Sequence, residues 1–326
     1  MSMRSWDFSV NIMARALILA AVGIIFCSST FAQKDSFKVV NIMDDFWTFW
    51  EKAENAEPGV QIELFRNIVI KPHNEIFLGF TGDQSDEDLG EYLKLVPKLI
   101  PRLKKVTAQL KTDLEKNKAV FLKNFPGMKW KGEVVFMPNF GVTDSGTGTL
   151  GGKQYLIFGV DTVAAQYGEN ADFSVLAHHE LFHLYLSELH SEWKDKNRSD
   201  GEVPLYWLVW NEGLATYVSH KLNPDATPEQ IFISKTLQHD AEEKLRVLAS
   251  GIRRNLINGS VDIWTPYMSN EKNDKGIPPR SGYYVGYLIA KELNKEMPLE
   301  KLAQLKGKDL IRKMDRILRK FEKYEP

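Results

Sequence analysis

Apolar residues recur at helical spacing in two segments of the chain. Residues 174–187 contain few polar positions between the apolar ones, which are Val175, Leu176, Phe182, Leu184 and Leu186. The second segment runs from Pro204 to Leu222; proline suits a first helical turn, and Asn223-Pro224 suits a helix end. A helix that is apolar on most sides is buried. Both segments are therefore predicted to be buried helices.

Further helices are predicted on both sides of this pair. Residues 39–56 should form a strongly aromatic helix, and residues 89–121 one or two amphipathic helices that are kinked by Pro97 and Pro101. Thr227-Pro-Glu-Gln230 is a capping box that starts a helix running to Asn258. A last helical segment is expected over residues 298–323.

Two short strands are predicted, over residues 132–138 and 154–160, with a loop between them over residues 139–153. The loop contains Gly146-x-Gly148-x-x-Gly151, which has the letters of a dinucleotide-binding fingerprint. That fingerprint should open a helix, but here it leads into the second strand, so nucleotide binding is disfavoured. Few strands among many helices indicate an α+β fold that is mostly helical.

The first buried helix carries the pattern His179-Glu180-x-x-His183. Residues four apart share one face of a helix, so both imidazoles can point at one ion. Glu180 then lies about 100° around the axis, beside the open side of that ion. Two imidazoles leave Zn²⁺ needing a third protein ligand and a water. The neighbouring His178 points elsewhere and is expected to be buried and hydrogen-bonded.

Glu212 is the candidate third ligand. It lies 29 positions beyond His183 on the second buried helix, which would carry its carboxylate toward the first helix. A metzincin pattern would instead need Gly at position 186 and His at position 189, where this chain has leucines, and His190 is one residue too far.

The combination of HExxH with Trp207-x-x-Trp-Asn-Glu212-Gly-Leu-Ala-x-Tyr217 resembles the gluzincin metallopeptidases, most of all their aminopeptidase-type branch. The layout is also similar to bacterial exported proteins predicted to be zinc-dependent proteases. The resemblance implies a zincin-like catalytic domain with a small antiparallel sheet, an active-site helix and a helical C-terminal lobe. The lobes would be residues 33–190 and 191–326, the second carrying the third zinc ligand.

Two departures from that family pattern matter. The gap from His183 to Glu212 is longer than usual, so an extra loop, residues 192–201, is expected. The chain also lacks the Gly-x-Met-Glu-Asn segment that binds a free substrate amine in true aminopeptidases, which weakens an exopeptidase assignment. The resemblance further implies that a strand before the HExxH helix lies at the cleft edge and pairs with peptide substrate; Gln154–Gly159 is the candidate.

The resemblance also suggests an oxyanion-stabilising tyrosine. Aminopeptidase-type families use a Tyr-x-x-Gly context downstream of the ligand Glu, and Tyr283-Tyr-Val-Gly286 matches it. Tyr283 is the first candidate and Tyr284 the second, although both could equally be helix packing residues. Arg280 could bind a substrate carboxylate or pair with an acid of the protein; the second interpretation is favoured.

The first residues of the chain predict export. Residues 1–32 carry Arg4 and Arg15 but only Asp7, an apolar run over residues 16–26, and Thr30-Phe-Ala32 as a cleavage signal. We expect a signal peptide and a periplasmic or secreted bacterial protein, with an uncleaved anchor or a Cys27 lipoprotein as the alternatives. The whole chain has net charge −1, which excludes a basic field for nucleic acid and leaves no polybasic membrane patch.

Three functions remain open on this pattern. The leading hypothesis is an exported zinc peptidase acting on a peptide or protein substrate through a zinc-activated water. One alternative is a zinc hydrolase of a small amide or ester, and the other is a non-catalytic zinc-stabilised binding protein. A structural zinc site closes its fourth position and needs no acid there. Glu180 therefore favours catalysis.

Overall fold

A four-stranded sheet with the order β1-β2-β4-β3 is the centre of the N-terminal part of the fold. The strands are Lys38–Asn41 (β1), Glu133–Met137 (β2), Ser145–Leu150 (β3) and Lys153–Gly159 (β4). This computed structural model describes residues 37–167, 173–193, 196 and 200–324. The predicted signal peptide lies outside the described residues.

The sheet is mixed, so the prediction of an antiparallel sheet was wrong. β1 pairs with β2 and β2 with β4 in parallel, and only β3 runs antiparallel to β4. Helices α2 to α5 separate β1 from β2 in the sequence, whereas β2 and β4 are separated by a loop and β3. The first strand replaces the start of the helix predicted over residues 39–56, and α2 begins only at Met43.

The predicted loop over residues 139–153 contains β3, which is the edge strand. It joins β4 through Gly151 and Gly152, both at positive φ, as a two-residue hairpin turn requires. The assignment of Gln154–Gly159 to the cleft edge was therefore wrong, because this segment lies inside the sheet between β2 and β3.

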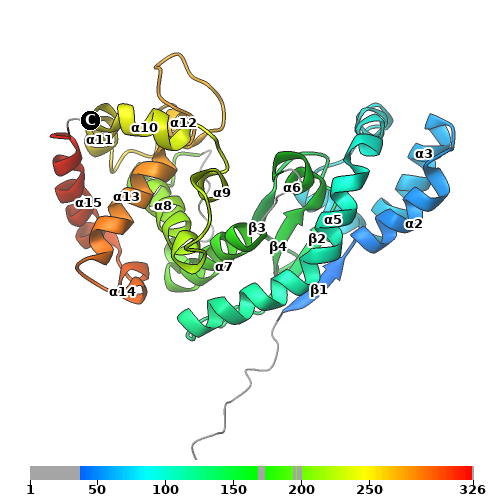
Figure 1. The fold of residues 1–326 in the computed structure, drawn as a ribbon, viewed down its shortest axis with the longest axis horizontal. Helices are drawn as coiled ribbons and strands as arrows, with labels where there is room; N and C mark the ends of the chain where they lie inside the picture. Colours follow the sequence, from blue (N-terminus) through cyan, green and yellow to red (C-terminus); the bar gives the residue numbers. More distant parts are fainter. Residues whose placement is uncertain (1–36, 168–172, 194–195, 197–199, 325–326) are drawn as a thin grey trace, which may run out of the picture. The chain divides into compact units, whose positions relative to one another are not determined.

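Helices make up most of the described chain (Figure 1). They are α2 Met43–Ala53, α3 Pro58–Phe65, α4 Asn74–Phe80, α5 Asp86–Asn124, α6 Val160–Tyr167, α7 Phe173–Leu189, α8 Leu205–Leu222, α9 Pro228–Phe232, α10 Leu237–Glu243, α11 Leu245–Arg254, α12 Val261–Met268, α13 Ser281–Asn294, α14 Leu299–Ala303 and α15 Gly307–Phe321. Short π and 3₁₀ turns occur at Arg66–Ile70, Lys71–His73 and Ser191–Trp193.

Helix α7 is held from several sides by aromatic packing. At its start, the Phe173 ring lies 4.7 Å from that of Phe158 on β4. Further along, Phe182 lies 5.3 Å from Phe125, which caps the end of α5. Helix α7 also packs against α8 and β3. The HExxH helix is therefore fixed between the sheet and the C-terminal helices.

Helices α8 and α13 form the most extensive helix pair of the fold, and two glycines allow it. A Cβ at Gly213 would lie 2.2 Å from the Gly286 backbone, and a Cβ at Gly286 would lie 2.1 Å from the Val209 carbonyl oxygen. The two backbones thus approach more closely than any side chain permits. This contact joins the helix that carries Glu212 to the helix that carries Tyr283.

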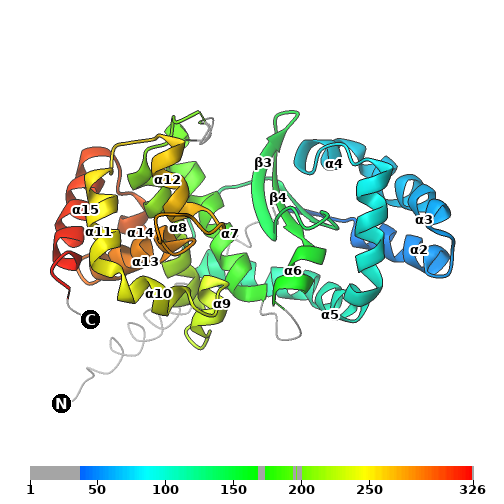
Figure 2. The same cartoon turned by 90° about the horizontal axis from the view of Figure 1, so that it is seen from above.

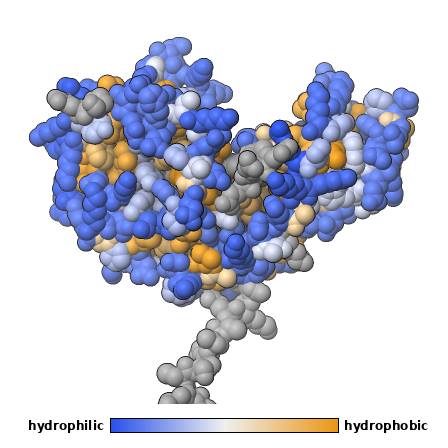
Figure 3. Space-filling view, in the orientation of Figure 1, coloured by the Kyte–Doolittle hydropathy of each residue, from blue (hydrophilic) through white to orange (hydrophobic). Residues whose placement is uncertain are grey.

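The described surface offers no extended apolar patch in the view of Figure 3, where apolar side chains are dispersed among hydrophilic ones. The most exposed large apolar residues belong to different elements, among them Leu78 on α4, Leu95 on α5 and Val247 on α11. Within the described ranges, none of the helices is both long and apolar enough to cross a membrane.

Candidate metal and catalytic site

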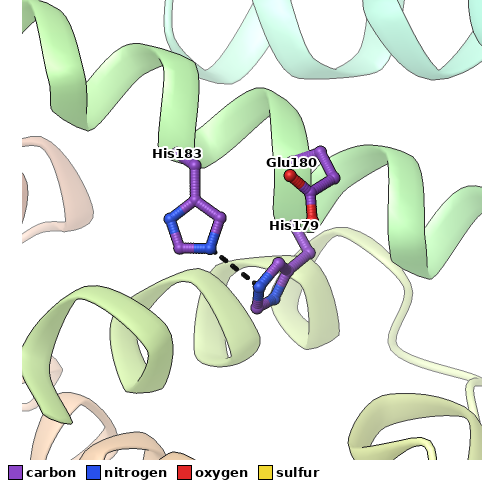
Figure 4. A group of neighbouring side chains, drawn as sticks. All are labelled: His179, Glu180 and His183. Atoms are coloured by element: carbon purple, nitrogen blue, oxygen red, sulfur yellow. Dashed lines mark hydrogen bonds between the residues drawn. The ribbon is translucent and has the colours of Figure 1, made fainter. Parts of the chain in front are cut away.

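Helix α7 points the two motif imidazoles toward each other. The Nε2 atoms of His179 and His183 lie 2.9 Å apart, and both rings extend from one face of the helix (Figure 4). Their four-residue spacing produces this arrangement, because one helical turn is 3.6 residues. The side chains are only 15% and 14% exposed. A shared position for one ion is therefore present beside α7.

Helix α8 adds the carboxylate of Glu212 to this pair. Its Oε2 atom lies 3.4 Å from Nε2 of His179 and 3.2 Å from Nε2 of His183. Glu212 is buried, and a buried carboxylate is costly unless a positive partner accompanies it. Two separate helices thus bring three potential ligand atoms together, as the sequence predicted for these residues.

The spacing of these three atoms suits zinc. Bonds of about 2.0–2.1 Å at tetrahedral angles place ligand atoms roughly 3.3 Å from one another. The three observed separations, 2.9, 3.2 and 3.4 Å, surround that value. The donor set of two imidazoles and one carboxylate is also one that catalytic zinc sites use. The residues present therefore fit the ion.

Glu180 offers a second carboxylate near the same point. The potential ligand atoms of His179, Glu180 and His183 all lie within 4.8 Å of one another. Oε1 of Glu180, however, accepts a hydrogen bond of 2.7 Å from the Ser145 hydroxyl. The Glu212 oxygen, by contrast, lies within 3.4 Å of both imidazoles, so the geometry favours Glu212 over Glu180 as the third potential ligand.

The site opens into a cavity of about 750 Å³. Its walls come from β3 and the turn before it, from α7, from α8, and from the start of α13. A cavity of this size accommodates an extended segment of substrate. Figure 2 shows β3 with α4 alongside, and in the described part of the chain no other strand pairs with the outer edge of β3.

The comparisons with known proteins identify the family. A family model described as "Putative zinc dependent peptidase (DUF5700)" matches residues 134–310, more than half of the chain. The chain belongs to this family. Neither the search of curated proteins nor that of solved structures found a match. The matched range of the DUF5700 family contains β3, α7, α8 and α13, and hence Ser145, His179, Glu180, His183 and Glu212.

The two tyrosine candidates of this DUF5700 member face different surroundings. Tyr283 lines the cavity and lies under the Arg280 guanidinium, whose central carbon is 4.4 Å from the ring centroid. Tyr284 is buried and donates a hydrogen bond to Glu242. Burial raises the pKa of Tyr284 far above its usual range, and the Glu242 carboxylate raises it further. Only Tyr283 is placed to meet a substrate in the cavity.

The expectation that Arg280 pairs with an acid was wrong. Among the described residues it donates to the Phe232 carbonyl oxygen at 3.3 Å, stacks on Tyr283 and forms no ion pair with a described acid. Arg280 also lines the cavity. Its backbone is left-handed, with φ 57°, which arises because the chain must turn sharply to begin α13.

Three of the other histidines, His178, His190 and His220, make structural contacts. His178 is buried and hydrogen-bonds to the Asn117 carbonyl at 3.1 Å and to Asn223 at 2.8 Å, as predicted. His190 lines the cavity, is buried and donates to the Ala303 carbonyl at 2.7 Å. His220 contacts the Tyr287 hydroxyl at 2.8 Å, and burial lowers the pKa of its imidazole.

Ser145 is the site residue that sequence reasoning missed. Its position depends on the turn before β3, which Asp161 holds by accepting hydrogen bonds from the Asn139 and Phe140 amides at 3.0 and 2.9 Å. Burial raises the pKa of Asp161, although these amide hydrogen bonds oppose the shift. The Gly151-Gly152 pair was the available signal, because it predicts a hairpin and hence a strand at Ser145.

Proposed function

We propose that this DUF5700 member hydrolyses peptide bonds, with a catalytic zinc held by His179, His183 and Glu212. The observation that carries the proposal is the convergence of these three side chains at 2.9–3.4 Å from two separate helices. The family's description as zinc-dependent peptidases supports it. The gluzincin assignment is part of the proposal and is supported by Glu212, which lies on a second helix and not on α7.

When bound, zinc lowers the pKa of an attached water and polarises the scissile carbonyl. Glu180 lies beside the ligand set without joining it, so its carboxylate accepts a proton from the attacking water and returns it to the leaving nitrogen. Ser145 donates to Oε1 of Glu180 at 2.7 Å and thereby fixes the orientation of the carboxylate. The second oxygen of Glu180 is the one assigned to the proton transfer.

Tyr283 has the role of oxyanion donor in this proposal. Its ring lines the same cavity as Glu180 and the zinc ligands, and stacking against Arg280 limits its rotation. A phenolic O–H aimed at the developing charge stabilises the transition state without reorganisation. The peptide backbone is assigned to the outer edge of β3, which can add a strand with little side-chain selectivity.

The decisive experiment compares the purified protein with Glu180→Gln, Glu212→Gln and Glu243→Gln. Glu243 is an exposed acid outside the cavity and serves as the matched control. Zinc content is measured by elemental analysis, and hydrolysis by mass spectrometry on a mixed peptide library. We expect stoichiometric zinc in all except Glu212→Gln, with hydrolysis only in the wild type and the control.

Other outcomes separate the alternative functions. Zinc in the wild type without hydrolysis of peptides, but with turnover of small amides or esters, would identify the second hydrolase class. Zinc without turnover of any of these, or hydrolysis that survives Glu180→Gln, would refute the proposed chemistry. A wild-type protein that does not bind zinc would refute the ligand assignment.

Export is a further part of the proposal, supported by the apolar run over residues 16–26 and the Ala32 cleavage signal. Mass spectrometry of the protein recovered from fractionated bacterial cells tests it. We expect a mature N-terminus at Gln33 outside the cytoplasm, and an intact leader in the cytoplasmic fraction alone would refute export.

A further inference from the structure

Arg280 is a cation in the cavity wall that the proposed chemistry does not use. Among the described lining residues, the two long basic side chains are Lys196 and Arg280. Lys196 donates to Glu202 at 3.0 Å, whereas the described part of the chain gives Arg280 no carboxylate partner. The guanidinium has five N–H donors. A single hydrogen bond to the Phe232 carbonyl leaves most of them available to a ligand.

The hydrogen bond from Arg280 to the Phe232 carbonyl joins two places where the backbone has an unfavourable conformation. Arg280 has φ 57°, and Ile233, which follows the carbonyl that Arg280 contacts, has φ 52°. A β-branched residue in the left-handed region is uncommon. Both residues line the cavity. Strained backbone of this kind clusters at binding and active sites, and here it lies in the cavity wall.

The position of Arg280 relates it to the reacting groups. It stacks on Tyr283, the proposed oxyanion donor, at 4.4 Å, and it shares the cavity with Glu180 and the zinc ligands. A planar guanidinium that is fixed by stacking is suited to bidentate contact with a carboxylate. It is not suited to a cationic or purely apolar substrate group. The chemistry of the wall beyond Tyr283 therefore selects an anion.

We propose that Arg280 binds a carboxylate of the substrate, which is either the C-terminal carboxylate or an Asp or Glu side chain near the cleaved bond. This inference rests on the proposed peptidase function and adds a substrate class to it. It predicts that the enzyme discriminates between substrates that differ only in one carboxylate. Arg280 sets specificity in this proposal and takes no part in proton transfer.

The test uses three matched pools of N-acetylated hexapeptides that are otherwise randomised over neutral residues. The first pool has a free C-terminal carboxylate, the second a C-terminal amide, and the third an amide with one Glu at each position in turn. Hydrolysis is measured by mass spectrometry for the wild type, Arg280→Met, Arg280→Lys and Arg246→Met. Arg246 is exposed on α11 outside the cavity and controls for the loss of one charge.

We expect the wild type and Arg246→Met to cleave the first or the third pool at least 10-fold faster than the second. The pool that is preferred tells which carboxylate Arg280 binds. Arg280→Met should reduce this ratio to about one, and Arg280→Lys should keep part of it. The ratio is the informative quantity, because disturbance of Tyr283 would slow all pools equally. Equal cleavage of all pools by the wild type, or an unchanged ratio in Arg280→Met, would overturn the inference.

A binding arm separates this inference from the peptidase proposal. Zinc-loaded Glu180→Gln protein, with and without Arg280→Met, is incubated with the same pools, and retained peptides are identified by mass spectrometry. Selective retention of carboxylate peptides that disappears with Arg280→Met supports the inference even if the wild type hydrolyses nothing. Equal retention of all pools would refute it whether or not the wild type is active.

Discussion

The close approach of α8 and α13 makes Gly213→Ala a sharp test of how the site is assembled. The added methyl would lie 2.2 Å from both the carbonyl carbon and Cα of Gly286, and 2.6 Å from the Tyr287 nitrogen. Ordinary contacts at this position begin near 3.4 Å. All three neighbours are backbone atoms, so no side chain can rotate away. The two helices must therefore separate by roughly 1 Å, since dense interiors transmit such strain.

The expected loss of stability follows from two opposing effects. Overpacking of a core costs typically about 1–3 kcal/mol, and contact between two backbones belongs at the upper end of that range. Replacing Gly by Ala within a helix returns about 1 kcal/mol. The net destabilisation is therefore about 2 kcal/mol. In a domain of this size each kcal/mol lowers the melting temperature by roughly 2–4 °C, so Tm should fall by about 4–8 °C.

The same movement should damage the site, because Glu212 precedes Gly213 on α8 and Tyr283 lies one turn before Gly286 on α13. A displacement of about 1 Å at a reacting group can cost roughly 100-fold in rate. We therefore expect kcat/KM to fall by 10- to 100-fold and zinc affinity to fall with it. Thermal unfolding, peptide hydrolysis and zinc titration with a chelator measure the three effects.

Gly90→Ala is the matched control. Gly90 lies within α5, and its added methyl would meet only the Ile62 side chain at 3.6 Å. The control should keep full activity and gain up to about 1 kcal/mol of stability. Gly286→Ala probes the same contact from α13, and its effect should be less than additive with Gly213→Ala, since one separation relieves both clashes. Wild-type Tm and activity in Gly213→Ala would show that this contact does not set the site.

Three further changes test other contacts. Ser145→Ala removes a hydrogen bond to a carboxylate, worth about 1.5–3 kcal/mol, so kcat should fall roughly 10- to 100-fold while zinc content and KM are preserved. Ser145→Thr should restore most of the lost kcat. An unchanged kcat in Ser145→Ala would exclude Ser145 as the positioning residue. Glu212→Ala should lose zinc on dialysis, as elemental analysis would show, and should no longer gain thermal stability when zinc is added, whereas the wild type gains it by mass action. Arg253→Met breaks the 2.7 Å ion pair that joins α11 to α15 through Glu322 and should lower the urea midpoint slightly at pH 7, because ion pairs near the surface contribute little to stability. The pKa of Glu322 is lowered by the hydrogen bond from Arg253, so this pair stabilises the fold above the unfolded pKa of about 4, and the stabilisation is lost as pH falls through the pKa of Glu322 in the folded protein. In urea unfolding, the difference in stability between the variant and the wild type should therefore be smaller at pH 3 than at pH 7. An equal difference at both pH values would contradict the assignment.

The sequence predicted the two helices of the site well because both are long, mostly apolar segments whose signal is local. Helix α7 spans Phe173–Leu189 and α8 spans Leu205–Leu222, close to the predicted ranges 174–187 and 204–222. Apolar residues at helical spacing determine such elements with little help from the rest of the chain. The four-residue spacing of two histidines likewise determines their common face.

Helix α5 shows how burial changes the meaning of a local signal. Pro97 and Pro101 were expected to kink it; they do not end the helix, which continues from Asp86 to Asn124, and its ribbon changes direction along its length (Figures 1 and 2). Both prolines are exposed. Proline has no N–H to donate, so one helical carbonyl loses its partner, but on the solvent side this carbonyl can bond to water. The apolar side of the helix keeps its packing. The pattern alone does not tell which side of a helix a proline will occupy.

The strands were harder to predict because their pairing is not local. β1 is four residues long, and its partner β2 lies far along the chain, so nothing near Lys38 distinguishes it from the start of a helix. β3 contains glycine and threonine in alternation rather than large apolar residues, because it is an edge strand. Its low hydrophobicity made it look like a loop, and the hairpin glycines were the better guide.

Strand β3, which was predicted to be part of a loop, bears on the proposed mechanism. Ser145 lies on β3, so the orientation of Glu180 depends on a strand whose outer edge is also assigned to the substrate. Its other edge is secured by β4 through a register that sets Ser145 opposite Phe158, and Asp161 anchors the turn before it. A peptide that pairs with β3 would restrain the same strand whose Ser145 holds Glu180, the proposed general base. Substrate backbone contacts made far from the zinc should therefore appear in kcat as well as in KM, since they stabilise the position of Ser145 in the transition state.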